Sequence, residues 1–205
     1  MAIAKKNITQ RALNAIETKN KIFTTAISLF KKYGYDKVTI EDITKQAKVS
    51  KGNFYTHFSS KDSVLAEQFH QIDVYYDEVF SDLPDSLSAS ERLLLLIKAM
   101  TEYCAYTCGI EVMRVVYASQ INNNDKVRIL NNKERRVYEH LRAIVALGKD
   151  NNEFTINMPN EDVVELLMRS ARAIIYDWCL YGEDFDLVSE AQRYFKIVIF
   201  CLKSR

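Results

Sequence analysis

The sequence predicts an all-α fold, and three observations support this prediction. Apolar residues recur three and four positions apart along most of the 205 residues, which is the spacing of one helix face. Only 5 glycines and 2 prolines interrupt this pattern, and few β-branched runs are bounded by turn residues. A hydrophobic content of 48% with 27% charged residues is that of a globular chain with a substantial core.

The first two helices are expected close to the N-terminus. Apolar positions at helical spacing predict a helix over residues 18–33, and Gly34 follows as a C-terminal cap. Thr39 and Asp42 stand three residues apart, which is typical of a capping box at the start of a second helix. This second helix is expected to end in a tight turn near Lys48.

A short third helix follows this turn. Ser50 is expected to cap it, and Phe54 and Phe58 stand four residues apart and can anchor it to the core. Two short helices joined by a tight turn form the layout of a helix-turn-helix, whose second helix enters the major groove of DNA. The residues that face outward from this helix are Ser50, Lys51, Gly52, Asn53, Tyr55, Thr56 and His57.

The remainder of the chain is also expected to be helical. A longer fourth helix starts where Ser59 and Asp62 can cap it and ends before Pro84. Further helices, separated by polar breaks, are expected at about residues 90–108, 110–121, 125–147, 160–181 and 184–202.

The charge is divided unevenly along the chain, although its net value is only +1. Residues 1–61 contain 12 Lys or Arg and 4 acidic residues, a local charge of +8. The remaining residues contain 16 basic and 23 acidic side chains, a charge of −7. Because Lys and Arg near phosphates release condensed counterions, this division indicates a protein that meets nucleic acid through its N-terminal end.

Three spaced motifs within residues 29–61 agree with this interpretation. They are Leu29-Phe30-x-x-x-Gly34-Tyr35, Thr39-Ile40-x-x-Ile43 and Val49-Ser50-Lys51-Gly52-Asn53-Phe54-Tyr55-x-His57-Phe58-x-x-Lys61. Over about residues 18–70 the chain resembles the TetR family of bacterial transcriptional regulators. The resemblance implies a homodimer, a three-helix DNA-binding head, and a helical body whose small-molecule pocket weakens operator binding when it is occupied.

This resemblance implies two domains. Residues 1–63 would form the helix-turn-helix DNA-binding domain, and residues 64–205 the helical domain for ligand binding and dimerisation. Residues 1–17 precede the resemblance and carry three basic residues, so a basic arm and an unstructured terminus are both open, with the second favoured.

The outward residues of the head separate into two expected roles. The N-terminal end of a helix at Thr39 suits a phosphate oxygen, and Tyr55, His57 and Lys61 resemble the phosphate-contacting residues of the family. These residues position the protein on DNA without reading its sequence. Lysine can donate to guanine and asparagine can pair with adenine, so the candidates for reading bases are Ser50, Lys51 and Asn53. Gly52 would allow close approach to the groove, and Thr56 shares the same outward face.

The body is expected to supply the dimer interface and the ligand pocket. The last two helices carry more apolar residues than one buried stripe requires, which favours a homodimer and an approximately palindromic operator. A pocket for an apolar or aromatic effector would use soft and aromatic side chains with a polar group for orientation. The candidate lining residues are Met100, Tyr103, Cys104, Met113, Tyr117, Met168 and Arg172. For each of these residues, simple packing in the core is the alternative.

Other classes of function are less well supported. The chain has no Gly-rich phosphate loop, zinc-protease motif or nucleophile elbow, so no enzyme, metal or cofactor is expected. The four cysteines lack metal-ligand spacing and are expected to be buried thiols, although Cys104 and Cys108 leave a redox role open. No signal peptide or membrane span is expected, which indicates a cytoplasmic protein. A co-activator that acts through a partner protein is the alternative function.

Overall fold

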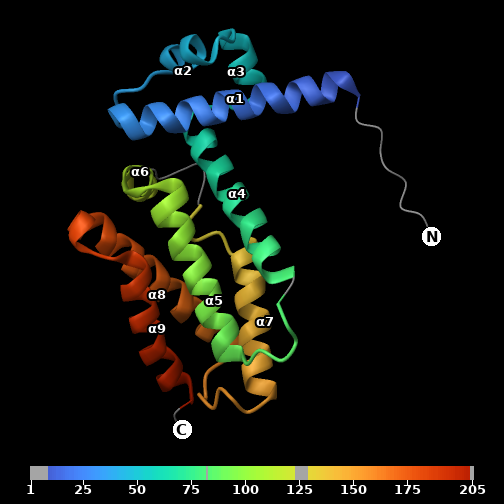
Figure 1. Ribbon diagram of the computed structural model, residues 1–205, viewed down its shortest axis with the longest axis vertical. Coiled ribbons are helices and arrows are strands. Elements are labelled where there is room, and N and C mark those ends of the chain that lie inside the picture. The colour runs from blue at the N-terminus through green and yellow to red at the C-terminus, as the bar shows by residue number, and fades with distance from the viewer. Residues whose placement is uncertain (1–8, 82, 123–128, 204–205) are drawn as a thin grey trace. The chain divides into compact units, whose positions relative to one another are not determined.

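The computed structural model describes residues 9–81, 83–122 and 129–203, and its regular secondary structure is helical, with no strand in these ranges (Figure 1). The all-α prediction is confirmed. The α-helices are α1 (Gln10–Tyr33), α2 (Ile40–Ala47), α3 (Lys51–His57), α4 (Lys61–Ser81), α5 (Ala89–Glu102), α6 (Ile110–Asn122), α7 (Arg136–Asp150), α8 (Asn160–Tyr181) and α9 (Leu187–Lys203). The first eight residues of the predicted arm, and residues 125–128 of a predicted helix, lie outside the described residues.

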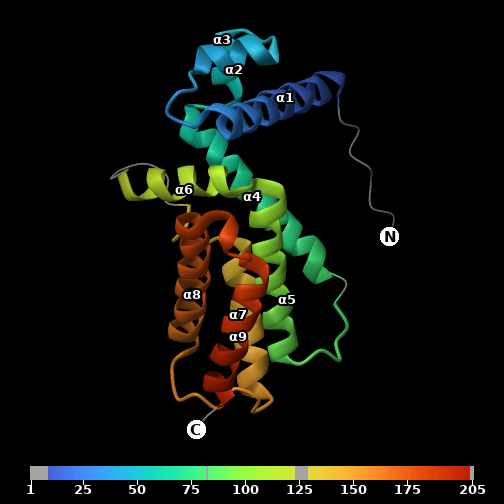
Figure 2. The ribbon, with the colours of Figure 1, turned by 60° about the vertical axis from the view of Figure 1, so that its left-hand side comes forward.

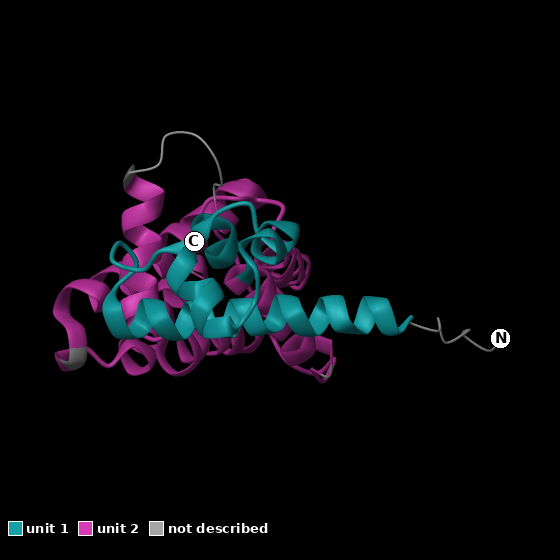
Figure 3. Cartoon of the chain, turned by 90° about the horizontal axis from the view of Figure 1, so that it is seen from above, with its two compact units in different colours: residues 1–67 teal, residues 68–205 magenta. Residues whose placement is uncertain are grey.

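The chain divides into two compact units, residues 1–67 and residues 68–205 (Figure 3). We call the first unit the head and the second the body. The boundary falls within α4, so the first turns of this helix belong to the head and the rest to the body.

The head has a core drawn from four helices. Its fully buried or nearly fully buried side chains are Ile22, Ala26 and Phe30 of α1, Ile43 and Ala47 of α2, Phe54 of α3 with Phe58 just after it, and Val64 and Leu65 of α4. The inward placement predicted for the phenylalanine pair of the third helix is therefore confirmed, and it fixes which side of α3 faces solvent.

The helix starts and stops predicted for α1–α3 are largely present. The backbone N–H of Gly34 donates to the carbonyl of Phe30, as expected of a C-terminal cap. The side chains of Thr39 and Ser50 cap α2 and α3, and Thr39 forms a full capping box with Asp42. The turn between these helices contains Lys48 in a left-handed conformation with φ of 53°.

Two predictions about the head were wrong in detail. The first helix begins at Gln10 rather than residue 18, because Thr9 accepts a hydrogen bond from the backbone N–H of Ala12. Its first two turns are mostly exposed, so no buried periodicity reveals them. The fourth helix is capped by Ser60 and Ser63, which exchange hydrogen bonds of 3.2 Å, and not by Ser59 and Asp62.

The body is a bundle in which α5, α7, α8 and α9 run side by side (Figure 2). Helix α5 packs on both α7 and α9, and α8 packs on α6, α7 and α9. At the end of α5 the chain continues as one π-helical turn, Tyr103–Cys108, and Gly109 then adopts a φ of 82° before α6 begins. None of the described helices is by itself long and apolar enough to cross a membrane; Ala89–Cys108 and Ile110–Ile121 meet those limits only as a pair, bent by 105° at their junction.

The prediction of a helix from residue 125 to 147 was wrong at its start. The described part of this segment stays in turns until α7 begins at Arg136. The side-chain oxygen of Gln120 accepts from the backbone N–H of Ile129, and that of Asn132 accepts from Glu134. These local bonds compete with helical hydrogen bonding.

The cysteines also differ from expectation. Cys104, Cys108 and Cys179 are buried, as predicted, but Cys201 is exposed on α9. Burial raises the pKa of the Cys104 thiol well above its ordinary value and that of Cys179 to about 11. The raised pKa values disfavour the thiolate, which is the reactive form, at these two buried cysteines.

Glu153 joins three parts of the body. Its carboxylate accepts hydrogen bonds from the backbone N–H groups of Ala89 (2.8 Å) and Ser90 (3.1 Å), and from the Ser90 hydroxyl. It also lies 3.2 Å from the ammonium group of Lys203 near the C-terminal end of α9. Partial burial acts to raise the pKa of Glu153, but these hydrogen bonds and the ion pair outweigh it and leave the pKa lowered.

Replacing Glu153 by glutamine is expected to lower the free energy of unfolding by about 1–2 kcal/mol at pH 7, because charge-assisted hydrogen bonds are lost. A lowered folded-state pKa means that this stability is present above the unfolded pKa and is lost as the pH falls through the folded pKa. The difference between the wild type and the variant should therefore shrink on acidification. Urea unfolding between pH 7 and about pH 3, which extends below the unfolded pKa, measures it, and a pH-independent difference would contradict this account.

Candidate nucleic-acid interface

Four of the nine residues predicted to contact DNA lie around one concavity of the head. Its volume is about 530 Å³. Thr39, Lys51, Tyr55 and Lys61 line it, and they come from the starts of α2, α3 and α4 and from the middle of α3. The turn between α2 and α3 and the inward anchoring of Phe54 bring these separate positions together.

The remaining predicted residues lie along α3. Gly52, Asn53 and Thr56 are exposed, and His57 is half-buried at the end of the helix. The hydroxyl of Thr56 donates to the carbonyl of Gly52 within the same helix. Ser50 is exposed too, but its hydroxyl oxygen already accepts from the backbone N–H of Asn53 at 3.1 Å.

Thr39 is bonded to an acidic residue at the N-terminal end of α2. Its hydroxyl donates to the carboxylate of Asp42 at 2.7 Å and accepts from the Asp42 backbone N–H at 3.1 Å. The hydroxyl and backbone N–H of Thr39 hold the pKa of the Asp42 carboxyl below its usual range. The capping carboxylate therefore stands where a phosphate oxygen would approach.

Lys61 is held in place by the chain that precedes α2. Its ammonium group donates to the carbonyls of Tyr35 at 2.9 Å and Val38 at 2.8 Å, and it lies 4.3 Å from the centre of the Tyr35 ring. The Tyr35 hydroxyl donates to Asp62 at 2.6 Å. The pKa of Tyr35 is raised, mainly by burial and to a smaller extent by this hydrogen bond to Asp62. Lys61 thus fixes the segment that leads into Thr39.

The concavity also contains residues that the sequence did not single out. Glu41 of α2 forms an ion pair with Lys51 of α3, and this bond is the first cause of a raised pKa for Lys51 and a lowered pKa for Glu41. Ser60, the N-terminal cap of α4, also lines the concavity. Glu41 and Lys51 are ten residues apart in the sequence and lie on different helices. Helical or strand periodicity does not relate residues on two sides of a turn, so the sequence did not predict this pair.

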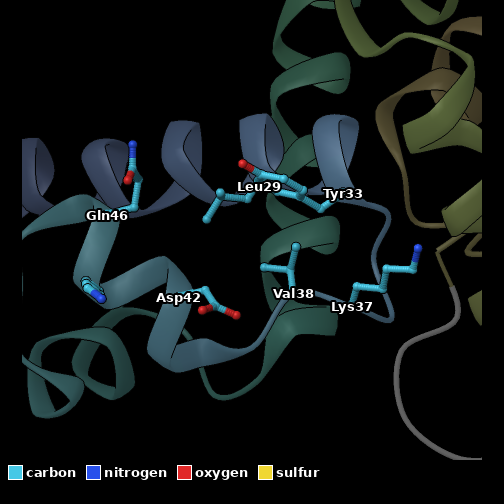
Figure 4. Close-up of a pocket in the computed structure, with 7 residues that line it drawn as sticks. Leu29, Tyr33, Lys37, Val38, Asp42 and Gln46 are labelled. Atoms are coloured by element: carbon cyan, nitrogen blue, oxygen red, sulfur yellow. The ribbon is translucent and has the colours of Figure 1, made fainter.

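A second concavity of about 440 Å³ lies between α1 and α2 (Figure 4). Leu29 and Tyr33 line it from α1, and Asp42 and Gln46 from α2. It contains none of the residues predicted to contact DNA.

The residues predicted to line a ligand pocket are spread over the helices of the body. Met100, Cys104, Met113 and Met168 are buried, whereas the three polar members are only partly so. They come from α5, its π-helical turn, α6 and α8.

These three polar members all have partners within the protein. The Tyr117 hydroxyl donates to the Arg172 carbonyl at 2.7 Å, and the Arg172 guanidinium donates to the carbonyl of Leu130 and the hydroxyl of Tyr138, each at 3.1 Å. The Tyr103 hydroxyl accepts from Gln68 at 3.4 Å, and burial raises the pKa of Tyr103 to about 12. Gln68, which is only 4% exposed, is a polar group that the sequence analysis missed.

The fold and this interface define an all-α protein with a helix-turn-helix head. Residues 22–67 match the family model described as bacterial regulatory proteins of the tetR family. The likeness to the TetR family is thus shown for this segment of the head.

Curated relatives match part of the chain. The chain is 37% identical over 65 residues to the uncharacterised HTH-type transcriptional regulator YuxN of Bacillus subtilis, which is 32% of this chain and 21% of YuxN. It is 42% identical over 50 residues to the A-factor receptor protein of Streptomyces griseus, which is 24% of this chain and 18% of that protein. It is 43% identical over 49 residues to IcaR, the negative transcriptional regulator of the icaADBC biofilm operon of Staphylococcus aureus, which is 24% of this chain and 26% of IcaR. The alignments thus span only about a fifth to a quarter of these relatives, and the relatives are named as regulators or receptors rather than enzymes.

Solved structures resemble the whole fold. A transcriptional regulator from Saccharomonospora viridis in complex with choline has a TM-score of 0.68 at 20% identity, over 90% of this chain and 96% of that one. The regulator FadR from Bacillus subtilis in complex with stearoyl-CoA has a TM-score of 0.68 at 17% identity, over 88% of this chain and 97% of that one. At these identities the likeness concerns the fold alone.

Proposed function

We propose that this chain is a ligand-responsive, homodimeric DNA-binding regulator that represses transcription in the cytoplasm and leaves its operator when a small molecule binds the body. The observation that carries this proposal is the concavity of the head, where Thr39, Lys51, Tyr55 and Lys61 meet beside the exposed face of α3. The charge of +8 over residues 1–61 supports it, because this charge attracts phosphate.

The contacts of the head indicate which residues would read bases and which would contact the DNA backbone. Asn53 is exposed on α3 and is free to reach a base edge, where asparagine pairs with adenine. Lys61 contributes its charge to the backbone contact and holds the carbonyls of Tyr35 and Val38, so that the start of α2 is presented to a phosphate.

Replacing Asn53 by alanine is expected to relax the preference for one base at one position of the operator, with a loss of about 1–3 kcal/mol of discrimination.

Replacing Lys61 by alanine should weaken binding to all DNA sequences. It should also reduce by about 1 the slope of the logarithm of the binding constant against the logarithm of the salt concentration. In vitro selection followed by titration at several salt concentrations measures both effects, with Lys98→Ala in the body as the control. If both variants bind the selected operator like the wild type, this assignment of the head is wrong.

The same selection separates the proposal from its alternative. A purified chain that selects a DNA sequence at nanomolar concentration without a partner acts as a regulator in its own right. A chain that selects no sequence would instead be a protein-interaction module.

We assign the dimer interface to the exposed apolar side chains of α8 and α9. The α8 residues Leu166, Tyr176 and Leu180 are 41%, 40% and 61% exposed, and Ile197 of α9 is 58% exposed. Other apolar residues of α8 are buried within the chain, among them Val164, Leu167, Met168, Ala171, Ile174, Ile175 and Trp178. The partner helices of a second copy would cover the exposed set, and the two-fold axis would place two heads on successive major grooves about 34–36 Å apart.

Replacing Ile197 by glutamate is expected to convert the dimer to a monomer of 23.8 kDa, because the interface would bury an unpaired charge. Light scattering coupled to gel filtration measures the mass. Lys196→Glu, at the preceding and also exposed position of α9, is the control and should remain dimeric. A wild-type chain that is monomeric at micromolar concentration would contradict the proposal.

The effector is proposed to be a largely apolar or aromatic compound bound within the body. The soft residues Met100, Met113 and Met168 can repack around such a molecule, and Gln68 and Tyr103 offer polar groups for its orientation. Regulation requires that the compound bind one conformation of the body better than the other. Choline and stearoyl-CoA, which the structural neighbours bind, are the first probes for a thermal-shift screen.

A further inference from the structure

The ion pair between Glu41 and Lys51 joins two helices at the rim of the DNA-facing concavity. Glu41 is the second residue of α2 and Lys51 the first residue of α3. Their side chains are 64% and 56% exposed, so both are accessible to DNA. Neither side chain packs in the core. Lys51, one member of the pair, is also expected to contact a base edge or a phosphate of DNA.

The concavity of the head is not an open cationic site. Of the two lysines that line it, Lys61 donates to the carbonyls of Tyr35 and Val38, and Lys51 is paired with Glu41. Asp36 and Asp62 also line it, so the described acidic side chains outnumber the lysines. A phosphate or a base that takes Lys51 must therefore displace a carboxylate.

We propose that Glu41 is an internal competitor of DNA for Lys51, so that it lowers the affinity of the head for DNA. This inference rests on the proposed DNA-binding function and concerns the same surface. The carboxylate of Glu41 and an acceptor of DNA, either a phosphate oxygen or a guanine atom, would accept hydrogen bonds from the same ammonium group of Lys51. Lys51 can therefore contact DNA only when its ion pair with Glu41 breaks. Glu41 thereby sets operator affinity low enough for a modest conformational change to release the protein.

The test is a double-mutant cycle on DNA binding at fixed, low salt concentration. Glu41→Gln keeps the size of the side chain and removes its charge, and Lys51→Ala removes the competing partner. Asp36→Asn is the matched control, because it also removes one negative charge from the concavity. It leaves the ion pair between Lys51 and Glu41 in place. Both members of the pair are exposed, so the variants should remain folded, and their melting temperatures verify this.

Glu41→Gln is expected to bind the selected operator about two- to fivefold more tightly than Asp36→Asn does, which is the range expected of one exposed ion pair. In the Lys51→Ala background this advantage should disappear. An equal gain from Glu41→Gln and Asp36→Asn, or a gain that persists without Lys51, would overturn the inference while leaving the DNA-binding function intact. A wild-type chain that binds no DNA would overturn both.

Discussion

Replacement of Arg135 by alanine is expected to lower the free energy of unfolding of the body by about 3–5 kcal/mol, the cost of breaking a buried ion pair from one side. The Arg135 guanidinium donates two hydrogen bonds to Asp73, at 3.1 Å and 2.8 Å, and the two side chains are only 10% and 11% exposed. It also stacks 4.9 Å from the ring centre of Phe69. The substitution would leave the Asp73 carboxylate buried without this partner.

This pair belongs to a row of contacts between the body part of α4 and the start of α7. One turn further along α4, Asp77 accepts from Arg136 at 2.9 Å and lies 2.9 Å from a ring nitrogen of His140. The hydrogen bond from Arg136 is the main reason that the pKa of Asp77 is lowered. A shift of this part of α4 must therefore move the start of α7 with it or break these contacts.

Chemical unfolding followed by circular dichroism measures the effect of Arg135→Ala. Arg169→Ala is the control, because Arg169 pairs with Glu165 in an i,i+4 arrangement and is 70% exposed. An exposed pair of this kind contributes at most about 0.5 kcal/mol. A loss for Arg135→Ala as small as that for Arg169→Ala would show that the buried pair contributes little.

The second large effect is expected from Gly148→Ala in α7. In most helices this change stabilises by about 1 kcal/mol. Here a β-carbon at position 148 would lie 2.2 Å from a ring carbon of Phe154, which is itself only 3% exposed. The backbone N–H of Phe154 also donates to the carbonyl of Gly148 at 2.9 Å, which holds the ring against the helix. Because overpacking costs about 1–3 kcal/mol, we expect a net loss of stability.

Urea unfolding of Gly148→Ala measures this loss. Gly52→Ala is the matched control in another helix, since the nearest atom to its added β-carbon is the hydroxyl of Ser50 at 3.8 Å. That substitution should stabilise the head by about 0.5–1 kcal/mol. Combining Gly148→Ala with Phe154→Leu should recover part of the loss, and strictly additive effects would argue against a direct clash.

Much of the head can be predicted from its sequence because its signals are local. The capping box at Thr39, the cap at Ser50, the glycine after α1 and the Phe54–Phe58 pair all act within four residues. The structure has each of them. Helix boundaries failed where no buried stripe or local cap was recognisable, as at the exposed start of α1 and before α7.

The sequence by itself determined the helical class, the helix-turn-helix, the charge division and the resemblance of the head to the TetR family, because periodicity, caps and charge are properties of neighbouring residues. Only the tertiary structure decided the partners of the chemically important side chains. It pairs Lys51 with Glu41, ties Lys61 to two carbonyls, and buries Asp73 against Arg135. These contacts join residues 10 to 62 positions apart, and such pairs depend on how whole helices pack rather than on any local pattern.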